Sequence, residues 1–177
     1  KTIDKQLFVP CNPNDCGLSL GQFLHHTKKQ LTTDVVYNGF DILDIDKLDT
    51  YKQKYNPVLC SIEGLVELIK KGKIIGIIQE GSEIGPRALG NRSIVCDPSV
   101  KDMKDILNAK VKFREWYRPF APVCRYEDKD IYFDNAFESC YMSYAPHVKE
   151  QYRELLPSIT HKDNTSRLQT VKKENHD

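Results

Sequence analysis

The sequence predicts a mixed fold of helices and strands, of the α/β or α+β class. Segments with helical apolar spacing and segments with strand-like apolar runs follow one another without strict alternation. Residues 61–71 show the helical spacing, and the continuous apolar run at 73–79 reads as a buried strand after a short turn. The chain has 177 residues and is 40% apolar, which is enough for one core. We expect a twisted mixed sheet with flanking helices.

The elements are expected in the following order along the chain. Residues 7–10 are strand-like, and the Asp-x-Gly turn at 15–17 leads into a helix that begins with small residues. Residues 34–57 have little periodicity and read as a connection with an edge strand at 41–45. Ser61 is the expected N-cap of the helix at 61–71, and Gly72 its expected stop. The later predictions are helices at 99–109 and 148–155 and strands at 120–125, 139–145 and 167–172.

The segment 84–93 is the strongest functional signal in the chain. It follows the predicted buried strand and contains two glycines, a proline and two arginines but no acid. Glycine allows close backbone approach, free N–H groups can point at an oxygen, and arginine offers a planar fork for phosphate or carboxylate. The pattern therefore indicates an anion site. The alternative is an ordinary surface turn whose arginines pair with nearby acids.

A second basic segment, 108–122, strengthens the anion interpretation. Lys110, Lys112 and Arg114 alternate with Val111 and Phe113, which in an extended chain places the cations on one face. Together the two segments could form a pocket for a polyanion such as a triphosphate. The alternative is a solvated charged face, but the interleaved aromatic residues and prolines argue against it.

Composition and cysteine usage argue against several classes of partner and of metal site. The net charge of +1 gives no argument for a nucleic-acid or membrane partner, and no run is long or apolar enough for a membrane span or signal peptide. The six cysteines form no C-x-x-C pair and no metal-ligand spacing with histidine. Buried free thiols in a reducing cytoplasm are the expected state.

Motifs along most of the chain carry a family resemblance. They are Glu83-Ile-Gly-Pro-Arg-Ala-Leu-Gly-Asn-Arg-Ser93, Asn108-Ala-Lys-Val-Lys112, Arg118-Pro-Phe-Ala-Pro122, Leu156-Pro-Ser-Ile-Thr-His161 and Arg167-Leu-Gln-Thr-Val171. In this order they resemble the C-terminal part of the NodU/CmcH-type carbamoyltransferases. The resemblance implies a YrdC-like domain that makes carbamoyl-adenylate from carbamoyl phosphate and ATP, preceded by an actin-like domain that passes the carbamoyl group to a small-molecule hydroxyl.

The resemblance also implies domain limits. Residues 1–33 match the tail of the actin-like domain, 34–57 the connection and 58–177 the YrdC-like domain. The family continues beyond the last residue with a segment that holds an active-site serine. The chain thus looks like a piece of a longer enzyme, and by itself we expect it to bind phosphate weakly and to transfer no carbamoyl group.

The family motifs assign roles to individual residues. Arg87 and Lys112 are the expected catalytic residues, and Arg118 and Arg167 are expected to hold phosphate and carbamoyl groups. Arg92 and Arg114 are substrate-binding candidates that could equally be structural. The full set implied for ATP and carbamoyl phosphate is Arg87, Arg92, Ser93, Lys112, Arg114, Arg118, His161 and Arg167. His161 could hydrogen-bond the nucleotide or brace its loop, while Trp116 and Tyr117 could stack on adenine, although core packing is expected for them.

Cofactors and partners follow from the same resemblance. ATP should arrive with Mg²⁺, and a divalent metal, expected to be iron, belongs to the actin-like domain. Asp15 matches one ligand of that metal in the intact protein; in this chain alone it reads as an N-cap or turn carboxylate, and His25 and His26 match nothing in the motif. A cytoplasmic enzyme is expected, and a homodimer is left open. A non-catalytic nucleotide- or phosphate-binding module and an RNA-binding domain are the alternatives, although the low net charge counts against RNA.

Overall fold

The computed structural model describes residues 9–31, 35–42 and 44–173, and within them the predicted mixed class is confirmed. The helices are η1 (Asp15–Gly17), α1 (Leu18–Thr27), η2 (Ile45–Lys47), α2 (Leu48–Tyr55), α3 (Ile62–Lys70), α4 (Met103–Ile106), η3 (Leu107–Lys112), η4 (Tyr126–Asp128), α5 (Lys129–Tyr132) and α6 (Glu150–Arg153). The strands are β1 (Ile75–Ile78), β2 (Arg92–Val95), β3 (Val123–Arg125), β4 (Phe133–Asp134), β5 (His147–Val148) and β6 (Gln169–Val171).

The described strands pair in three separate two-stranded sheets, where one mixed sheet was expected. β1 and β2 are antiparallel, β4 and β5 are antiparallel, and β3 and β6 are parallel. Three prolines, Pro98, Pro119 and Pro122, stand between β2 and β3. Since proline has no N–H to donate to a sheet ladder, this connection does not continue the first sheet into the second.

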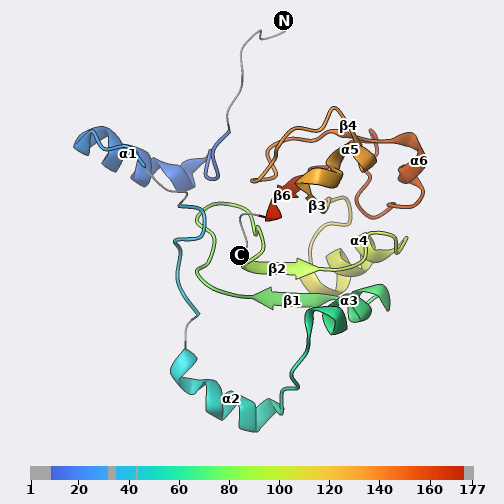
Figure 1. Ribbon diagram of the computed structural model, residues 1–177, viewed down its shortest axis with the longest axis horizontal. Coiled ribbons are helices and arrows are strands. Elements are labelled where there is room, and N and C mark those ends of the chain that lie inside the picture. Colours follow the sequence, from blue (N-terminus) through green and yellow to red (C-terminus); the bar gives the residue numbers. More distant parts are fainter. Residues whose placement is uncertain (1–8, 32–34, 43, 174–177) are drawn as a thin grey trace, which may run out of the picture.

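The α3–β1 unit forms as the sequence predicts, but the expectation of a buried strand is wrong, because β1 has no buried residue and Ile78 is 68% exposed. The Ser61 side chain caps α3 by accepting a hydrogen bond from the Gly64 N–H at 3.1 Å. Gly72 follows the helix with a φ of 72°, a conformation that glycine adopts without a steric cost. The chain then turns directly into β1, which pairs with β2 (Figure 1).

The N-terminal helices bury little surface. The Asp-x-Gly turn and the helix after it form as predicted, as η1 and α1. Neither α1 nor α2 contains a buried residue, and Figure 1 shows both lying away from the three sheets. The edge strand predicted at 41–45 is wrong for the described residues of that range, because 41, 42 and 44 form no strand and Ile45 begins η2. Residues 7 and 8 of the predicted first strand lie outside the described part of the chain.

The second predicted helix starts later and runs further than expected. It begins at Met103 and passes at Leu107 into a π-helix that ends at Lys112. The extended conformation predicted for Lys110 and Lys112 is therefore wrong. The reason is apolar spacing: Met103 and Leu107 are both buried, so burial of one helical face overrides the local alternation of charge.

The C-terminal third confirms three predicted elements and contradicts one. β3, α6 and β6 lie inside the predicted ranges. The segment predicted as a strand at 139–145 has only an isolated bridge, from Tyr144 to Leu168. Instead, Ser139 is tied to the β6 segment by three hydrogen bonds, one of which its carbonyl accepts from the Thr170 N–H at 3.0 Å. The Ser139 N–H donates to Thr170 Oγ1 at 2.8 Å and the Ser139 hydroxyl to the Leu168 carbonyl at 2.7 Å.

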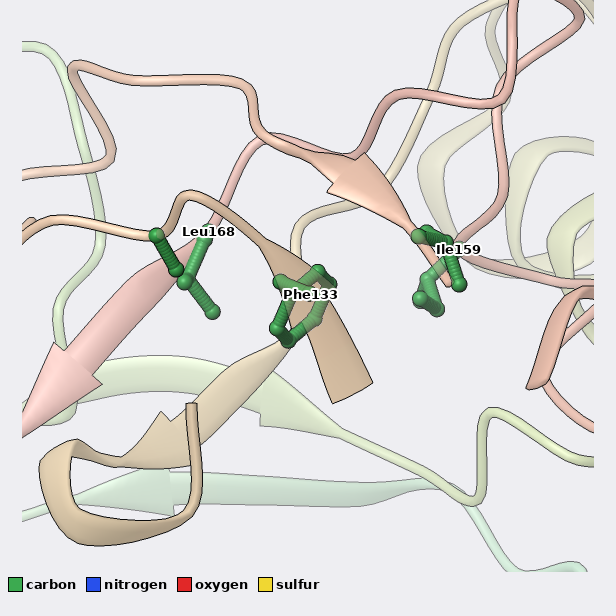
Figure 2. Packing of buried hydrophobic residues seen from close by; sticks show 5 residues of the cluster. Phe133, Ile159 and Leu168 are labelled. Carbon is green, nitrogen blue, oxygen red and sulfur yellow. The ribbon is translucent and has the colours of Figure 1, made fainter. Parts of the chain in front are cut away.

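Two apolar clusters hold the described chain together. The larger contains Phe133, Ala136, Val148, Ile159 and Leu168, three of which are labelled in Figure 2. The smaller joins Cys11 and Val36 from the N-terminal segment to Leu89, which lies between β1 and β2. The smaller cluster therefore anchors the arginine-bearing segment that the sequence singled out.

The cysteines are free thiols, but they are not uniformly buried. Cys11 is buried, whereas Cys16 and Cys60 are exposed. The expectation of buried thiols is thus wrong for those two, which lie in an exposed helical turn and an exposed loop.

Within the described ranges, no helix has the length and apolar character needed to cross a membrane.

Candidate anion-binding site

The loop between β1 and β2 is organised around one carboxylate. Glu83 Oε1 accepts hydrogen bonds from the backbone N–H groups of Leu89 at 2.6 Å, Asn91 at 3.0 Å and Arg92 at 3.3 Å. Burial raises the pKa of Glu83, but these amide donors together outweigh burial and hold its pKa below the ordinary value of 4.5. Glu83 therefore closes the loop as a charged internal acceptor.

The use of these amides corrects one expectation. The N–H groups of 84–93 were expected to face a bound anion, but the Leu89, Asn91 and Arg92 amides already bind Glu83. The Gly90 N–H donates to Ser93 Oγ at 2.9 Å, so the Ser93 hydroxyl also braces the loop. These four amides are therefore engaged within the loop itself.

Arg92 is a bracing residue in this structure. Its Nη1 donates to the Gln79 and Asn91 carbonyls at 2.7 and 2.9 Å, and its Nη2 to the Glu80 and Phe40 carbonyls at 3.0 and 3.2 Å. Both terminal nitrogens of the guanidinium thus donate hydrogen bonds to backbone carbonyls. The sequence had left a substrate-binding and a structural role open for Arg92, and these contacts favour the structural one.

Arg87 has the opposite environment. It lies at the exposed tip of the same loop, and its only hydrogen bond in the described structure is to the neighbouring Pro86 carbonyl, at 3.3 Å. No carboxylate of the described residues lies within ion-pair distance of it. The paired-surface-turn alternative therefore does not hold for Arg87.

A buried asparagine positions the second pair of arginines. Asn108, on η3, accepts from Arg114 Nε at 2.7 Å and donates to the carbonyls of Trp116 and Arg118 at 3.2 and 3.0 Å. The Arg114 guanidinium also lies over the Phe120 ring, 4.6 Å from its centroid. Arg118 forms one long, exposed ion pair with Glu115, at 3.8 Å. Asn108 thus fixes the turn that carries both cations.

Arg167 joins these arginines from the C-terminal end of the chain. It is half-buried just before β6, and its Nε is shielded from solvent without a hydrogen-bond partner. Burial, followed by the charges of Arg87, Arg114 and Arg118, lowers the pKa of Arg167. The charges of three arginines, up to 80 residues away in sequence, thus act on Arg167; we call Arg87, Arg114, Arg118 and Arg167 the arginine cluster.

The other predicted site residues are placed as follows. Lys112 ends η3, and its exposed side chain forms no hydrogen bond or ion pair with any described residue, so its part in the site stays a prediction. Trp116 and Tyr117 are 73% and 63% exposed, which makes the expectation of core packing wrong for both. They stack edge to face on one another, beside the turn that holds Arg114 and Arg118.

His161 follows Ile159, a member of the larger apolar cluster, by two residues. Its Nδ1 is 3.1 Å from the Thr165 hydroxyl, while its Nε2 is shielded from solvent and has no partner. Burial is the main cause that lowers the pKa of His161, and the charge of Arg167 acts in the same direction. His161 thus lies within the electrostatic range of the arginine cluster and carries an unused nitrogen.

The predicted metal ligand has no companions in the described residues. Asp15 is exposed in η1, and no three His, Cys, Asp or Glu side chains of the described ranges are placed to hold a metal ion. Asp15 as a ligand stays a prediction for a longer protein.

Sequence reasoning missed the residues that shape the site. Glu83, Asn108 and Thr165 bind no anion themselves but hold those that could, and Gln169 Nε2 donates to the Leu89 carbonyl at 2.9 Å across the molecule. Glu83 stood in the quoted motif, and its isolation as an acid just before an acid-free segment was a usable signal. Asn108 also opened a quoted motif, but its buried hydrogen-bonding role, like that of Thr165, depends on tertiary contacts that the sequence does not display.

Comparison with known proteins adds a family match. Residues 66–177 match the family model described as the carbamoyltransferase C-terminus. This range contains all four members of the arginine cluster, together with Glu83, Asn108 and His161. It leaves α1 and α2 outside the match.

Individual relatives are also similar. The chain is 50% identical over 108 residues to nodulation protein NolNO of Sinorhizobium fredii, a match that covers 59% of this chain and 16% of that protein. It is 36% identical over 172 residues to 3'-hydroxymethylcephem-O-carbamoyltransferase of Amycolatopsis lactamdurans, covering 93% of this chain and 31% of the relative. Nodulation protein U of Sinorhizobium fredii is 34% identical over 169 residues, covering 93% and 29%. The chain thus spans less than a third of the length of these relatives.

Proposed function

The chain belongs to the carbamoyltransferase C-terminus family, and from that premise we propose that its arginine cluster binds the anionic substrates of an ATP-dependent O-carbamoyltransferase. The observation that carries the proposal is the state of Arg167. Arg167 is half-buried, its Nε is unused, it has no carboxylate partner in the described residues, and burial and the charges of three other arginines lower its pKa. Like charges that act on a half-buried cation are costly, and a bound anion offsets that cost.

Phosphate groups suit this cluster better than a side-chain carboxylate does. Arginine presents a fixed fork of donors that matches phosphate geometry, and several forks can surround one group. Carbamoyl phosphate and ATP are both polyanions that repel each other, so an enzyme that joins them needs a basic pocket. We assign Arg87, Arg118 and Arg167 to phosphate contacts, and Lys112, as a compact charge, to the transferring group.

The proposed chemistry has two steps. Water releases carbamate and inorganic phosphate from carbamoyl phosphate. A carbamate oxygen then attacks the α-phosphorus of ATP, the bond from that phosphorus to the bridging oxygen breaks, and pyrophosphate leaves with the electron pair. The product is carbamoyl-adenylate. The arginines neutralise charge that develops on the phosphoryl oxygens, and Mg²⁺ that arrives with ATP is held mainly by the nucleotide phosphates.

The final acceptor is proposed as the hydroxyl group of a small molecule. Support comes from the relatives that are named as O-carbamoyltransferases acting on 3'-hydroxymethylcephem. In the proposal the acceptor is selected outside the arginine cluster, by the part of the relatives that this chain does not span.

Calorimetric titration with inorganic phosphate, carbamoyl phosphate and ATP tests the proposal. Arg167→Ala, Arg87→Ala and Lys112→Ala should each weaken binding by about 1–3 kcal/mol, the range for a lost charge-assisted contact. Arg125→Ala is the matched control: it removes the same charge, but Arg125 is already paired with Asp128 at 2.6 Å. Its affinity should equal that of the wild type.

Three results would count against the proposal. Unchanged phosphate and ATP affinity in Arg87→Ala and Arg167→Ala would remove the cluster from the site. Salt-sensitive retention of tRNA on filters, lost in the same variants, would favour the RNA-binding alternative. Binding of ATP without pyrophosphate release by the longer protein would favour a non-catalytic nucleotide-binding module.

A further inference from the structure

His161 takes part in a short chain of side-chain hydrogen bonds. Its Nδ1 is 3.1 Å from Thr165 Oγ1, and the Thr165 hydroxyl is 2.7 Å from Asp163 Oδ1. The Thr165 N–H also donates to Asp163 Oδ1, at 3.1 Å. These bonds lower the pKa of Asp163, so the carboxylate is ionised at neutral pH and can only accept.

The chain determines which nitrogen of His161 carries the proton. The single hydroxyl proton of Thr165 is donated to Asp163, so Thr165 Oγ1 must accept from His161 Nδ1. The proton of the neutral imidazole therefore resides on Nδ1. The imidazole is neutral at pH 7 because burial lowers its pKa below the ordinary 6.5. Nε2 is left as a bare acceptor.

Two side chains of the candidate site thus carry unused atoms of opposite kind. His161 Nε2 is an acceptor without a donor, and Arg167 Nε is a donor without an acceptor; both are shielded from solvent. The Arg167 charge acts on His161, so the two side chains are neighbours electrostatically. A ligand that satisfied both would be an anion with an N–H or O–H group close to its charged end.

We propose that His161 Nε2 accepts a hydrogen bond from the amino group of the carbamoyl substrate and thereby selects a carbamoyl group over an acyl group. The inference rests on the proposed function. Carbamoyl phosphate carries an NH₂ group three bonds from its phosphorus, whereas acetyl phosphate has a methyl group in that place. A methyl group would leave the buried Nε2 unpaired, which a site built around a hydrogen bond rejects strongly.

Ligand entry requires a local movement. Neither His161 Nε2 nor Arg167 Nε contacts solvent in the unliganded structure. A ligand therefore reaches these two atoms only if neighbouring side chains move when it binds.

A pair of stable analogues tests the selection. Phosphonoacetamide and acetonylphosphonate differ only in an NH₂ group against a CH₃ group, and neither hydrolyses. Calorimetry at neutral pH should show that the wild-type chain binds phosphonoacetamide about tenfold more tightly, the effect of about one net hydrogen bond. His161→Phe should abolish the preference by weakening the amide alone, and His161→Gln, whose side-chain oxygen can accept, should keep part of it.

The outcomes separate this inference from the proposed function. If neither analogue nor inorganic phosphate binds the wild-type chain, the proposed function fails, and the selection fails with it. If both analogues bind with equal affinity, or if His161→Phe retains the preference, the selection alone is overturned. Phosphate affinity in the variants shows that the site is intact, so a loss of preference is not a loss of folding.

Thr165 provides a second, spectroscopic readout as a positioning residue. In ¹⁵N-resolved NMR spectra the His161 imidazole should show its proton on Nδ1. Thr165→Val should remove that tautomer preference and lower the preference for phosphonoacetamide severalfold. A proton on Nε2 in the wild type would overturn the proposal, because that nitrogen could then only donate.

Discussion

Among substitutions that remove no positive charge, loss of Glu83 should damage the candidate anion site most. Glu83→Ala leaves the amides of Leu89, Asn91 and Arg92 without their shared acceptor. We expect the free energy of unfolding to fall by about 1.5–3 kcal/mol, the range for hydrogen bonds to a charged group. Urea denaturation followed by circular dichroism measures the change.

Glu154→Ala is the control for this prediction, because Glu154 is an exposed carboxylate at the end of α6. It should change the free energy of unfolding by less than about 0.5 kcal/mol, as surface substitutions usually do. Equal losses in the two variants would mean that the Glu83 contacts do not hold the loop.

The same carboxylate predicts a dependence of stability on pH. The folded pKa of Glu83 is lowered, so its contribution is present above the unfolded value of 4.5 and is lost as the pH falls through the folded pKa. The difference in free energy of unfolding between the wild type and Glu83→Gln should therefore be largest above pH 4.5. It should shrink in urea titrations at progressively lower pH, and a difference that grows with acidification would contradict the assignment.

At the scale of elements, η3 should act as the support of Arg114 and Arg118. Asn108→Ala removes the acceptor of Arg114 Nε and the donor to two carbonyls of the following turn. Phosphate affinity should fall about tenfold although no charge is lost, because the cations are no longer held in place. Calorimetric titration measures the loss.

Val111→Ala on the same helix is the matched control. Val111 is exposed and contributes no hydrogen bond from its side chain, so phosphate affinity should be unchanged. If Asn108→Ala also leaves the affinity unchanged, the turn is held by other contacts and η3 has no positioning role.

Elements whose local signals all point to the same structure could be predicted from the sequence. α3 has a capping serine, an apolar stripe and a terminal glycine, and all three appear in the structure. η3 could not be predicted, because its charge alternation and its apolar spacing pointed to different periods and only burial decided between them. The segment 139–145 was misread for a related reason: its residues have strand propensity, but the Ser139 hydroxyl donates to the Leu168 carbonyl and the Ser139 N–H to the Thr170 hydroxyl.

The whole molecule should not be equally stable throughout. α2 buries no residue, whereas Val148, Ser166 and Leu168 are fully buried around the larger apolar cluster. Amide hydrogen exchange should therefore be fast in 48–55 and slow in 166–170, since fast exchange follows from few buried contacts. Mass spectrometry of exchanged peptides checks this prediction, and similar protection in the two segments would contradict the packing.

The candidate site shows the same division between what sequence can and cannot predict. The arginines were identified from their motifs, because a cation without a nearby acid is visible in the sequence. Their separate roles were not: Arg92 donates to four backbone carbonyls while Arg87 has no acidic partner among the described residues, although both belong to one motif. Only the tertiary structure distinguishes a cation that braces a loop from one that is left for a ligand.

The hydrogen bond from Gln169 to the Leu89 carbonyl spans 80 positions of the chain, and Arg167 stands only two residues from its donor. Contacts of such sequence separation form late in folding, because a long loop must close before they gain anything. Phosphate affinity should consequently appear in the last kinetic phase of refolding. A growing chain completes Arg87, Arg114 and Arg118 before Arg167 is added, so the arginine cluster is assembled only after synthesis has reached the segment that precedes β6.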